Sequence, residues 1–234
     1  MKLKKDIELN KNIYNAHYQE KEIYYEPYLE VIEHIFMKEG YSSLLDFGCG
    51  NGKLGKYLRD NNHHISIDGI DISETAIEKA KKYYNNVYIR HDYKLPDKKY
   101  DFIILNSVIE HIYEENLAIL FEDIKKKATG NASLFVTVPN IHSPHYLFFD
   151  NLEKEKKEAG HVTMKSKKAW LDFFRSWGFN TFRFSFFIKL KHLDRIMYFK
   201  NLPLLHRIVK LCYNLLLISP FNRLKVSFYI HIKK

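Results

Sequence analysis

Three glycines at alternate positions, directly after a short apolar run, constrain the fold of this chain more than any other feature. The stretch 42–55 reads SSLLDFGCGNGKLG, and the three glycines are Gly48, Gly50 and Gly52. The apolar residues around Asp46 are typical of a strand buried on both faces, and residues 53–59 have the apolar spacing of a helix. Glycine adopts backbone angles that side chains forbid, so this turn lets a ligand approach the main chain closely. A strand, a glycine turn and a helix in this order predict a nucleotide-type binding crevice in a parallel α/β sheet.

Two ligands fit this turn. Gly50 begins a match to G-x-G-x-x-G that ends at Gly55, and Asp71 follows about 20 residues on, as in sites that bind a dinucleotide through its ribose. Alternatively, Asp46 and the run 48–52 form one unit that resembles motif I of the class I S-adenosylmethionine (SAM) methyltransferases. A pyrophosphate is anionic, whereas SAM carries an ammonium and a sulfonium. Because an acid attracts a cation and repels an anion, Asp46 favours SAM.

The next two predicted strands each carry an acid at or near their end. Residues 65–73, ISIDGIDIS, predict a second strand that ends at Asp71, and a carboxylate accepts both ribose hydroxyls at once. Residues 87–93, VYIRHDY, predict a third strand with Asp92 at its end. In the methyltransferases that the chain resembles, an acid at this place lies near the adenine amino group, and Tyr93 stands beside it here.

The fourth predicted strand, 101–105, leads into Asn106 and then into Glu110 and His111 at the carboxyl edge of the sheet. This stretch resembles motif IV of the same family, especially the small-molecule O-methyltransferases of the ubiquinone-biosynthesis type, which carry a Glu-His pair here. A dinucleotide dehydrogenase gives no reason to expect that pair. The fifth predicted strand, 132–140, ends in Pro-Asn, again as in that family. Taken together, the strand ends favour SAM as cofactor, with S-adenosylhomocysteine as product.

The resemblance covers about residues 25–190 and implies one α/β domain over 1–234. Its fold is expected to be Rossmann-like, with a seven-stranded, mostly parallel sheet, an antiparallel last strand at 226–234 and helices on both faces. A helical cap is expected over 1–40, and a helical insert over about 193–225 precedes the last strand. The residues that the resemblance assigns to the cofactor are Asp46, Gly48, Gly50, Asn51, Gly52, Asp71, Ile72, Asp92, Tyr93 and Asn106.

Methyl transfer is an in-line displacement, so the enzyme mainly aligns the acceptor and excludes water. An alcohol acceptor must also lose a proton, which suits a histidine. His111 and His161 are the main candidates, His145 is the third, and Glu110 is expected to orient a histidine or bind the acceptor. No paired metal-ligand acids stand out, so no metal is predicted, although Glu110 and the first two histidines could converge on one.

The composition bears on the acceptor and the partners. A net charge of +9 and a pI near 9.2 fit an anionic acceptor, such as a sugar or a phosphorylated glycan precursor. A nucleic-acid substrate is not expected, because neither an N-P-P-Y-type signature nor an RNA-binding module is present. A membrane-associated quinone or lipid methyltransferase is the alternative, since 203–220 reads as a basic amphipathic stretch too short between charges to span a bilayer. The charged N-terminus favours a cytoplasmic protein. For 203–220, contact with a membrane surface, a lid over the acceptor, a contact with another subunit and packing against its own domain all stay open.

Overall fold

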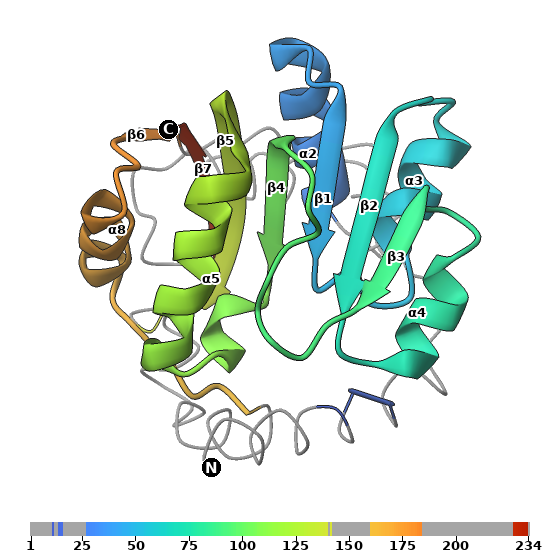
Figure 1. Ribbon diagram of the computed structural model, residues 1–234. Helices are drawn as coiled ribbons and strands as arrows, with labels where there is room; N and C mark the ends of the chain where they lie inside the picture. Colours follow the sequence, from blue (N-terminus) through green and yellow to red (C-terminus); the bar gives the residue numbers. More distant parts are fainter. Residues whose placement is uncertain are drawn as a thin grey trace, which may run out of the picture.

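A computed structural model describes residues 11, 14–15, 27–139, 141, 160–183 and 227–233 of the chain (Figure 1). The helices are α2 (Pro27–Glu39), α3 (Lys53–Asp60), α4 (Glu74–Ala80), the short 3-10 helix η1 (Ile109–His111), α5 (Glu114–Lys127) and α8 (Lys167–Ser176). The strands are β1 (Ser43–Phe47), β2 (Ser66–Asp71), β3 (Asn86–Ile89), β4 (Tyr100–Asn106), β5 (Ala128–Pro139), β6 (Thr181–Arg183) and β7 (Ser227–Lys233). Among the described helices, none is both long and apolar enough to cross a bilayer.

The strands form one sheet in the order β3-β2-β1-β4-β5-β7-β6. Strand β1 pairs in parallel with β2 on one side and with β4 on the other, whereas β7 runs antiparallel to both β5 and β6. The chain order reverses between β1 and β4, and in such sheets ligands bind at the carboxyl ends of the strands near that point. The predicted Rossmann-like α/β fold with a parallel sheet is therefore confirmed.

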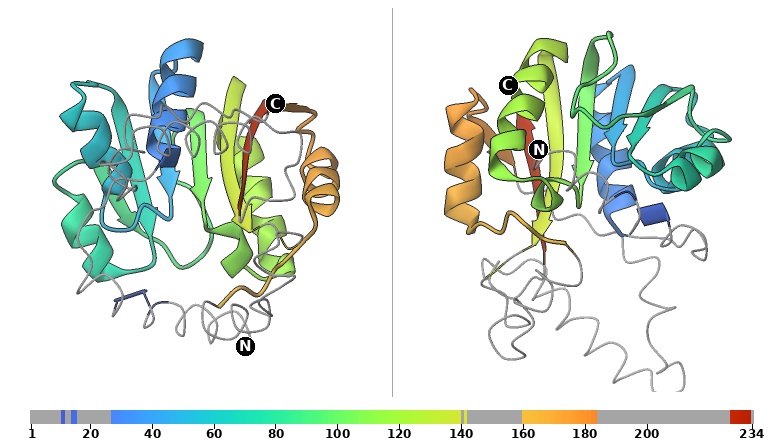
Figure 2. Two further views of the ribbon diagram at one scale, coloured as in Figure 1. Left: turned by 180° about the vertical axis from the view of Figure 1, so that it is seen from behind. Right: turned by 60° about the horizontal axis from the view of Figure 1, so that its bottom comes forward.

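Helices cover both faces of the sheet (Figures 1 and 2). Successive residues of a strand point to opposite faces, so Leu44 and Leu45 of β1 enter two different clusters of buried side chains. The cluster of Leu45 includes Phe121 of α5 and Trp170 of α8, and the cluster of Leu44 includes Ile32 of α2 together with apolar residues of α3 and α4. Both faces of the central strands are thus sealed from water, which leaves their carboxyl ends as the place for chemistry.

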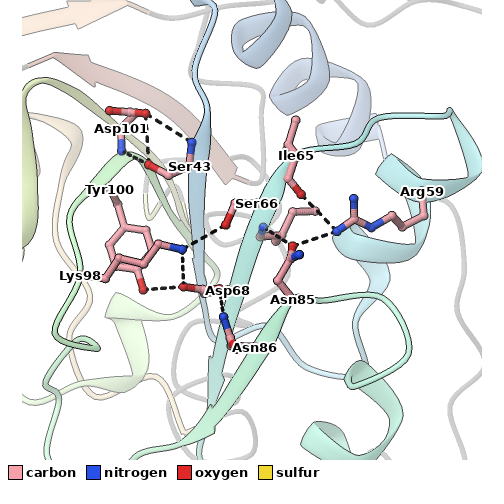
Figure 3. A network of polar contacts seen from close by, with 11 residues as sticks. Ser43, Arg59, Ile65, Ser66, Asp68, Asn85, Asn86, Lys98, Tyr100 and Asp101 are labelled. Atoms are coloured by element: carbon pink, nitrogen blue, oxygen red, sulfur yellow. Dashed lines mark hydrogen bonds and ion pairs between the residues drawn. The ribbon is translucent and has the colours of Figure 1, made fainter.

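A buried polar network fixes the sheet around β2 (Figure 3). The carboxylate of Asp68, fully buried in β2, accepts hydrogen bonds from Lys98 Nζ at 3.0 Å and from the Tyr100 hydroxyl at 2.9 Å. Its other oxygen accepts from Asn86 Nδ2 of β3 at 2.9 Å. A buried charge is tolerated only when it is paired and hydrogen-bonded, so these contacts link β2 to β3 on one side and, across β1, to the start of β4 on the other. The same strand ends at Asp71.

Several predicted boundaries differ from the structure. Strand β3 stops at Ile89, so Asp92 and Tyr93 lie in the following loop rather than in the strand predicted over 87–93. Tyr93 has a positive φ of 56°, which a strand does not allow. The predicted sixth strand covers 182–188. The structure describes only its first two residues, which lie in β6, and the rest falls outside the described residues.

Other predictions fall wholly or partly outside the described residues. The insert 193–225, with its amphipathic stretch 203–220, lies outside them, and so does His145. The cap predicted over 1–40 is described only in part, through residues 11 and 14–15 and through α2.

Candidate active site

The glycine turn between β1 and α3 has the backbone that only glycine adopts readily. Gly48, Gly50 and Gly52 all have positive φ angles, of 84°, 53° and 86°. The amides of Gly48 and Cys49 both donate to the Ile70 carbonyl of β2, at 2.7 and 2.9 Å. A Cβ on Gly48 would lie 2.3 Å from Val108 Cγ2, in the loop after β4. The turn therefore lies directly against the loop after β4, and a side chain at position 48 would clash with Val108.

Asp71 lies at the end of β2, as predicted, and is buried beside the turn. Its Oδ2 accepts from the Gly50 amide and its Oδ1 from the Ser73 amide, both at 2.8 Å. Burial raises the pKa of Asp71, and these backbone hydrogen bonds oppose the rise. A carboxylate has about four acceptor positions, so Asp71 can still accept from a ribose hydroxyl beside its backbone donors, which include the Ile72 amide. Asp71 also holds the glycine turn itself, a role that the sequence did not reveal.

Asp46 has a different setting from the one expected. Its carboxylate is buried and accepts a hydrogen bond at 2.5 Å from the hydroxyl of Tyr84, which in turn accepts from the Gly55 amide at 3.2 Å. Burial raises the pKa of Asp46 to about 7, although the hydrogen bond from Tyr84 opposes this. Near neutral pH the carboxyl is thus only partly charged, and the argument that its charge selects a cation is weaker than predicted. The choice of cofactor must come from other observations.

Gly55 is a glycine because of Tyr84. A Cβ on Gly55 would lie 2.5 Å from Cε2 of the Tyr84 ring. The match to G-x-G-x-x-G therefore reflects packing of α3 against this ring. No phosphate is needed to explain it.

The remaining residues assigned to the cofactor lie around the same edge of the sheet. Asn51 is buried in the glycine turn, and Ile72 directly follows Asp71. Asp92 is exposed in the loop after β3 and accepts from the Lys94 amide at 3.2 Å. Asn106 Oδ1 accepts from the Thr137 hydroxyl of β5 at 2.8 Å, which fixes its orientation at the end of β4. Their contacts with a cofactor stay predictions.

The candidate catalytic residues Glu110, His111 and His161 come together although about 50 residues of chain separate the second from the third. One ligand atom from each lies within 4.8 Å of the others. The two imidazole rings meet edge to face, with centroids 4.7 Å apart and an interplanar angle of 62°. Glu110 is only 2% exposed, so its carboxyl group is shielded from water.

Thr163 holds the two parts of this cluster together. Its amide donates to the Glu110 carbonyl at 3.0 Å, and its hydroxyl donates to the Ile112 carbonyl at 2.7 Å. The Gly160 carbonyl lies 3.3 Å from His111 Nδ1. Because a carbonyl only accepts, Nδ1 carries the hydrogen and Nε2 carries the lone pair of the neutral ring. His111 is thereby prepared to take a proton, or to bind a metal, through Nε2.

A Glu-His-His set also suits a divalent transition metal ion. Within the described part of the chain, these three residues are the group that could hold a metal ion. That no metal is bound stays a prediction.

The N-terminal segment contributes to the site as well. Lys11 pairs with Glu74 at 2.6 Å, and Asn15 Oδ1 accepts from the Ser73 hydroxyl at 2.6 Å. Tyr14 lies between them in sequence, with its ring centroid 5.7 Å from that of His111 and at 87° to it. In Figure 1 these dark-blue pieces lie beneath the carboxyl ends of the strands. Residues 11 and 14–15 of the predicted cap thus lie at the carboxyl ends of the strands, whereas α2 packs on one face of the sheet.

Comparison with known proteins identifies the family. Residues 17–183 match the family model described as "Methyltransferase domain". This chain belongs to that methyltransferase family. Membership confirms the predicted enzyme class and, with it, SAM as the cofactor rather than NAD. The glycine turn and Asp71 fit this cofactor, since they offer an open main chain and a carboxylate for a ribose.

Three similar proteins illustrate the relationship. A protein named as methyltransferase 235L, from Invertebrate iridescent virus 6, is 28% identical over 120 residues, which cover 48% of this chain and 43% of the viral protein. A SAM-dependent methyltransferase from Archaeoglobus fulgidus has a similar structure, with a TM-score of 0.59, 20% identity and coverage of 88% of this chain and 94% of that one. The plantazolicin methyltransferase BpumL with S-adenosylhomocysteine also has a TM-score of 0.59, with 17% identity and coverage of 96% and 90%.

The chain spans less than half the length of the curated relatives that it matches. The structural likenesses show the shared fold.

Proposed function

We propose that the protein transfers a methyl group from SAM to a hydroxyl oxygen of a small acceptor. The observation that carries this proposal is the Glu110–His111–His161 cluster, which follows the end of β4. Val108, two residues before Glu110, packs against Gly48 of the glycine turn. The predicted proton acceptor would thus lie next to the glycine turn that is predicted to bind SAM, and this arrangement supports O-methylation of an alcohol.

Each part of the site has a defined task in this proposal. Bound SAM supplies a methyl group that its sulfonium has already activated. Asp71 and the glycine turn hold and orient the cofactor, and Glu110 with His161 aligns the acceptor hydroxyl. His111 takes the hydroxyl proton at Nε2, because its Nδ1–H is directed at the Gly160 carbonyl. Most of the rate enhancement would come from alignment and exclusion of water, to which the shielded Glu110 contributes.

A divalent metal held by the same three residues is the second candidate for how the acceptor is activated. It is favoured by the convergence of one carboxylate and two imidazoles within 4.8 Å. A bound ion would lower the pKa of a coordinated hydroxyl and orient it, without a protein base.

The acceptor class rests on charge and on resemblance. We favour a sugar or a phosphorylated glycan precursor, because a net charge of +9 suits an anionic acceptor. A quinone or lipid acceptor, in a protein attached to the membrane surface through 203–220, is the alternative that the resemblance to ubiquinone-biosynthesis enzymes supports. Nucleic acid is not expected as a partner, and we expect the protein to act in the cytoplasm.

The first experiment is a thermal-shift measurement with SAM, S-adenosylhomocysteine and NAD in parallel. A ligand at 100 times its dissociation constant adds about 2.7 kcal/mol of stability, enough to raise the midpoint by a few degrees. We expect a rise with both adenosyl ligands and none with NAD. A rise with NAD alone would contradict the proposal.

The second experiment tests the cluster in turnover assays with a panel of hydroxylated acceptors. His111→Ala and His161→Ala should leave SAM affinity within about twofold and lower kcat by about 100-fold or more, as expected for loss of a general base. His64→Ala, at an exposed histidine outside the cluster, is the matched control and should change neither. If treatment with EDTA abolishes turnover and a divalent ion restores it, the metal role replaces the base role. Full activity of both cluster variants would refute either role.

A further inference from the structure

Tyr14 is tied to the cofactor side of the crevice through its neighbours in sequence. The hydroxyl of Ser73 donates to Asn15 Oδ1 at 2.6 Å and caps α4 by accepting from the Ala76 amide at 3.1 Å. The Ser73 amide in turn donates to Asp71 at 2.8 Å. A continuous run of hydrogen bonds thus leads from the predicted ribose carboxylate to the residue beside Tyr14.

The same tyrosine also reaches the acceptor side. Its ring is nearly perpendicular to that of His111, with 5.7 Å between the two centroids. Burial raises the pKa of the Tyr14 hydroxyl, and the charges of Glu110 and Asp71 raise it further. The hydroxyl therefore stays protonated, and it lies within electrostatic reach of one carboxylate from each side of the site. Both carboxylates are at least nine-tenths buried, with exposures of 2% for Glu110 and 7% for Asp71.

The Tyr14 ring lies beside His111, the neighbour of Glu110 in sequence, and its hydroxyl is influenced by the charges of both buried carboxylates, which makes its surroundings favourable for a cation. A ring face attracts a ligand cation within about 6 Å, and the attraction grows when water is excluded. The transferred methyl must lie between the ribose that Asp71 holds and the acceptor beside Glu110, and there SAM carries its positive sulfonium. After transfer the same sulfur is a neutral thioether.

We propose, on the basis of the proposed function, that the ring of Tyr14 contacts the sulfonium of bound SAM and makes the site prefer the cationic donor to its neutral product. The two ligands differ only by the methyl group and the charge on sulfur. The ratio of their affinities therefore isolates interactions at that atom, whereas a role in folding or in closing the crevice would change both affinities alike.

The test is isothermal titration calorimetry of the full chain with SAM and with S-adenosylhomocysteine. Tyr14→Leu removes the ring and should raise the dissociation constant for SAM by about tenfold, and that for S-adenosylhomocysteine by less than about twofold. Tyr14→Phe keeps the ring and should preserve the wild-type ratio within about twofold. Tyr57→Leu is the matched control, because Tyr57 is a half-buried tyrosine of α3 whose hydroxyl donates to Glu33 outside the site.

The outcomes separate this inference from the proposed function. If Tyr14→Leu weakens both ligands by the same factor, or neither, the tyrosine does not recognise the sulfonium and the inference is wrong. If Tyr14→Phe behaves like Tyr14→Leu, the hydroxyl and not the ring is responsible, which also overturns it. If the wild-type protein binds neither ligand, the proposed function itself falls.

Discussion

Replacing Tyr84 by phenylalanine should weaken the fold in a way that depends on pH. The change keeps the ring that packs against Gly55, so no cavity forms, but it removes one hydrogen bond to Asp46 and one from the Gly55 amide. A hydrogen bond to a charged group contributes about 1.5–3 kcal/mol, and a buried amide left without an acceptor costs about 1–3 kcal/mol. We therefore expect the free energy of unfolding to fall by about 3 kcal/mol above neutral pH.

The sign of the pH dependence follows from Asp46. Its pKa is about 7 in the folded protein because it is buried, and the hydrogen bond from Tyr84 keeps it from rising further. In the variant the pKa is higher, so the folded variant binds the proton more tightly than the folded wild type does. The loss of stability should therefore grow as the pH rises through 7. Below pH 7 the carboxyl of Asp46 is protonated in both folded proteins, so the substitution removes only a neutral hydrogen bond from it, which contributes about 1 kcal/mol.

Urea unfolding of both proteins at about pH 6 and about pH 8.5 measures this difference. The matched control is the same substitution in an Asp46→Asn background, where no carboxyl titrates and the loss should be equal at the two pH values. An equal loss at both pH values in the native background would refute the reasoning, since the Tyr84 hydroxyl would then not stabilise a charged carboxylate.

Two further sets of substitutions test the glycine turn and Asp71. Gly48→Ala should destabilise the fold by about 1–3 kcal/mol more than Gly40→Ala, because both glycines have a positive φ but only a Cβ on Gly48 meets Val108; equal losses in urea unfolding would show that packing plays no part. Asp71→Ala should weaken SAM binding at least about tenfold in calorimetry, since a charged acceptor contributes about 1.5–3 kcal/mol per hydrogen bond. Asp71→Asn, which keeps one acceptor oxygen, should lose less, and unchanged affinity in both variants would contradict the assignment of the ribose.

Local sequence patterns predict the residues at the ends of the strands. A strand, its terminal polar residue and the turn after it are contiguous in the chain, so the positions of Asp71, Asn106 and Glu110 follow from pattern and strand order alone. The sequence leaves the convergence of Glu110 and His111 with His161 as an open possibility, because no local pattern places a residue 50 positions away beside them. Strand β3 was less predictable, because the positive φ of Tyr93 leaves no mark in its apolar pattern.

The contacts that support those residues could not be predicted. Thr163 bonds to carbonyls of Glu110 and Ile112, and a threonine that binds distant main-chain atoms has no signature in sequence. The same holds for Ser73 and its contact with Asn15, which lies 58 positions away. Hydrogen bonds of this kind depend on where folding brings the backbone, and single-sequence patterns carry no such information.

Tyr84 shows how such a contact can also mislead. Its ring requires a glycine at position 55, and that glycine completes a pattern typical of dinucleotide sites. Its hydroxyl meanwhile lies against Asp46, so the acid that argued for a cationic ligand has a pKa of about 7. One side chain thus produced the strongest signal for the wrong cofactor and weakened the electrostatic argument for the right one. The assignment of SAM instead depends on the family. Asp71, whose carboxylate meets the turn directly through the Gly50 amide, fits the ribose of either ligand.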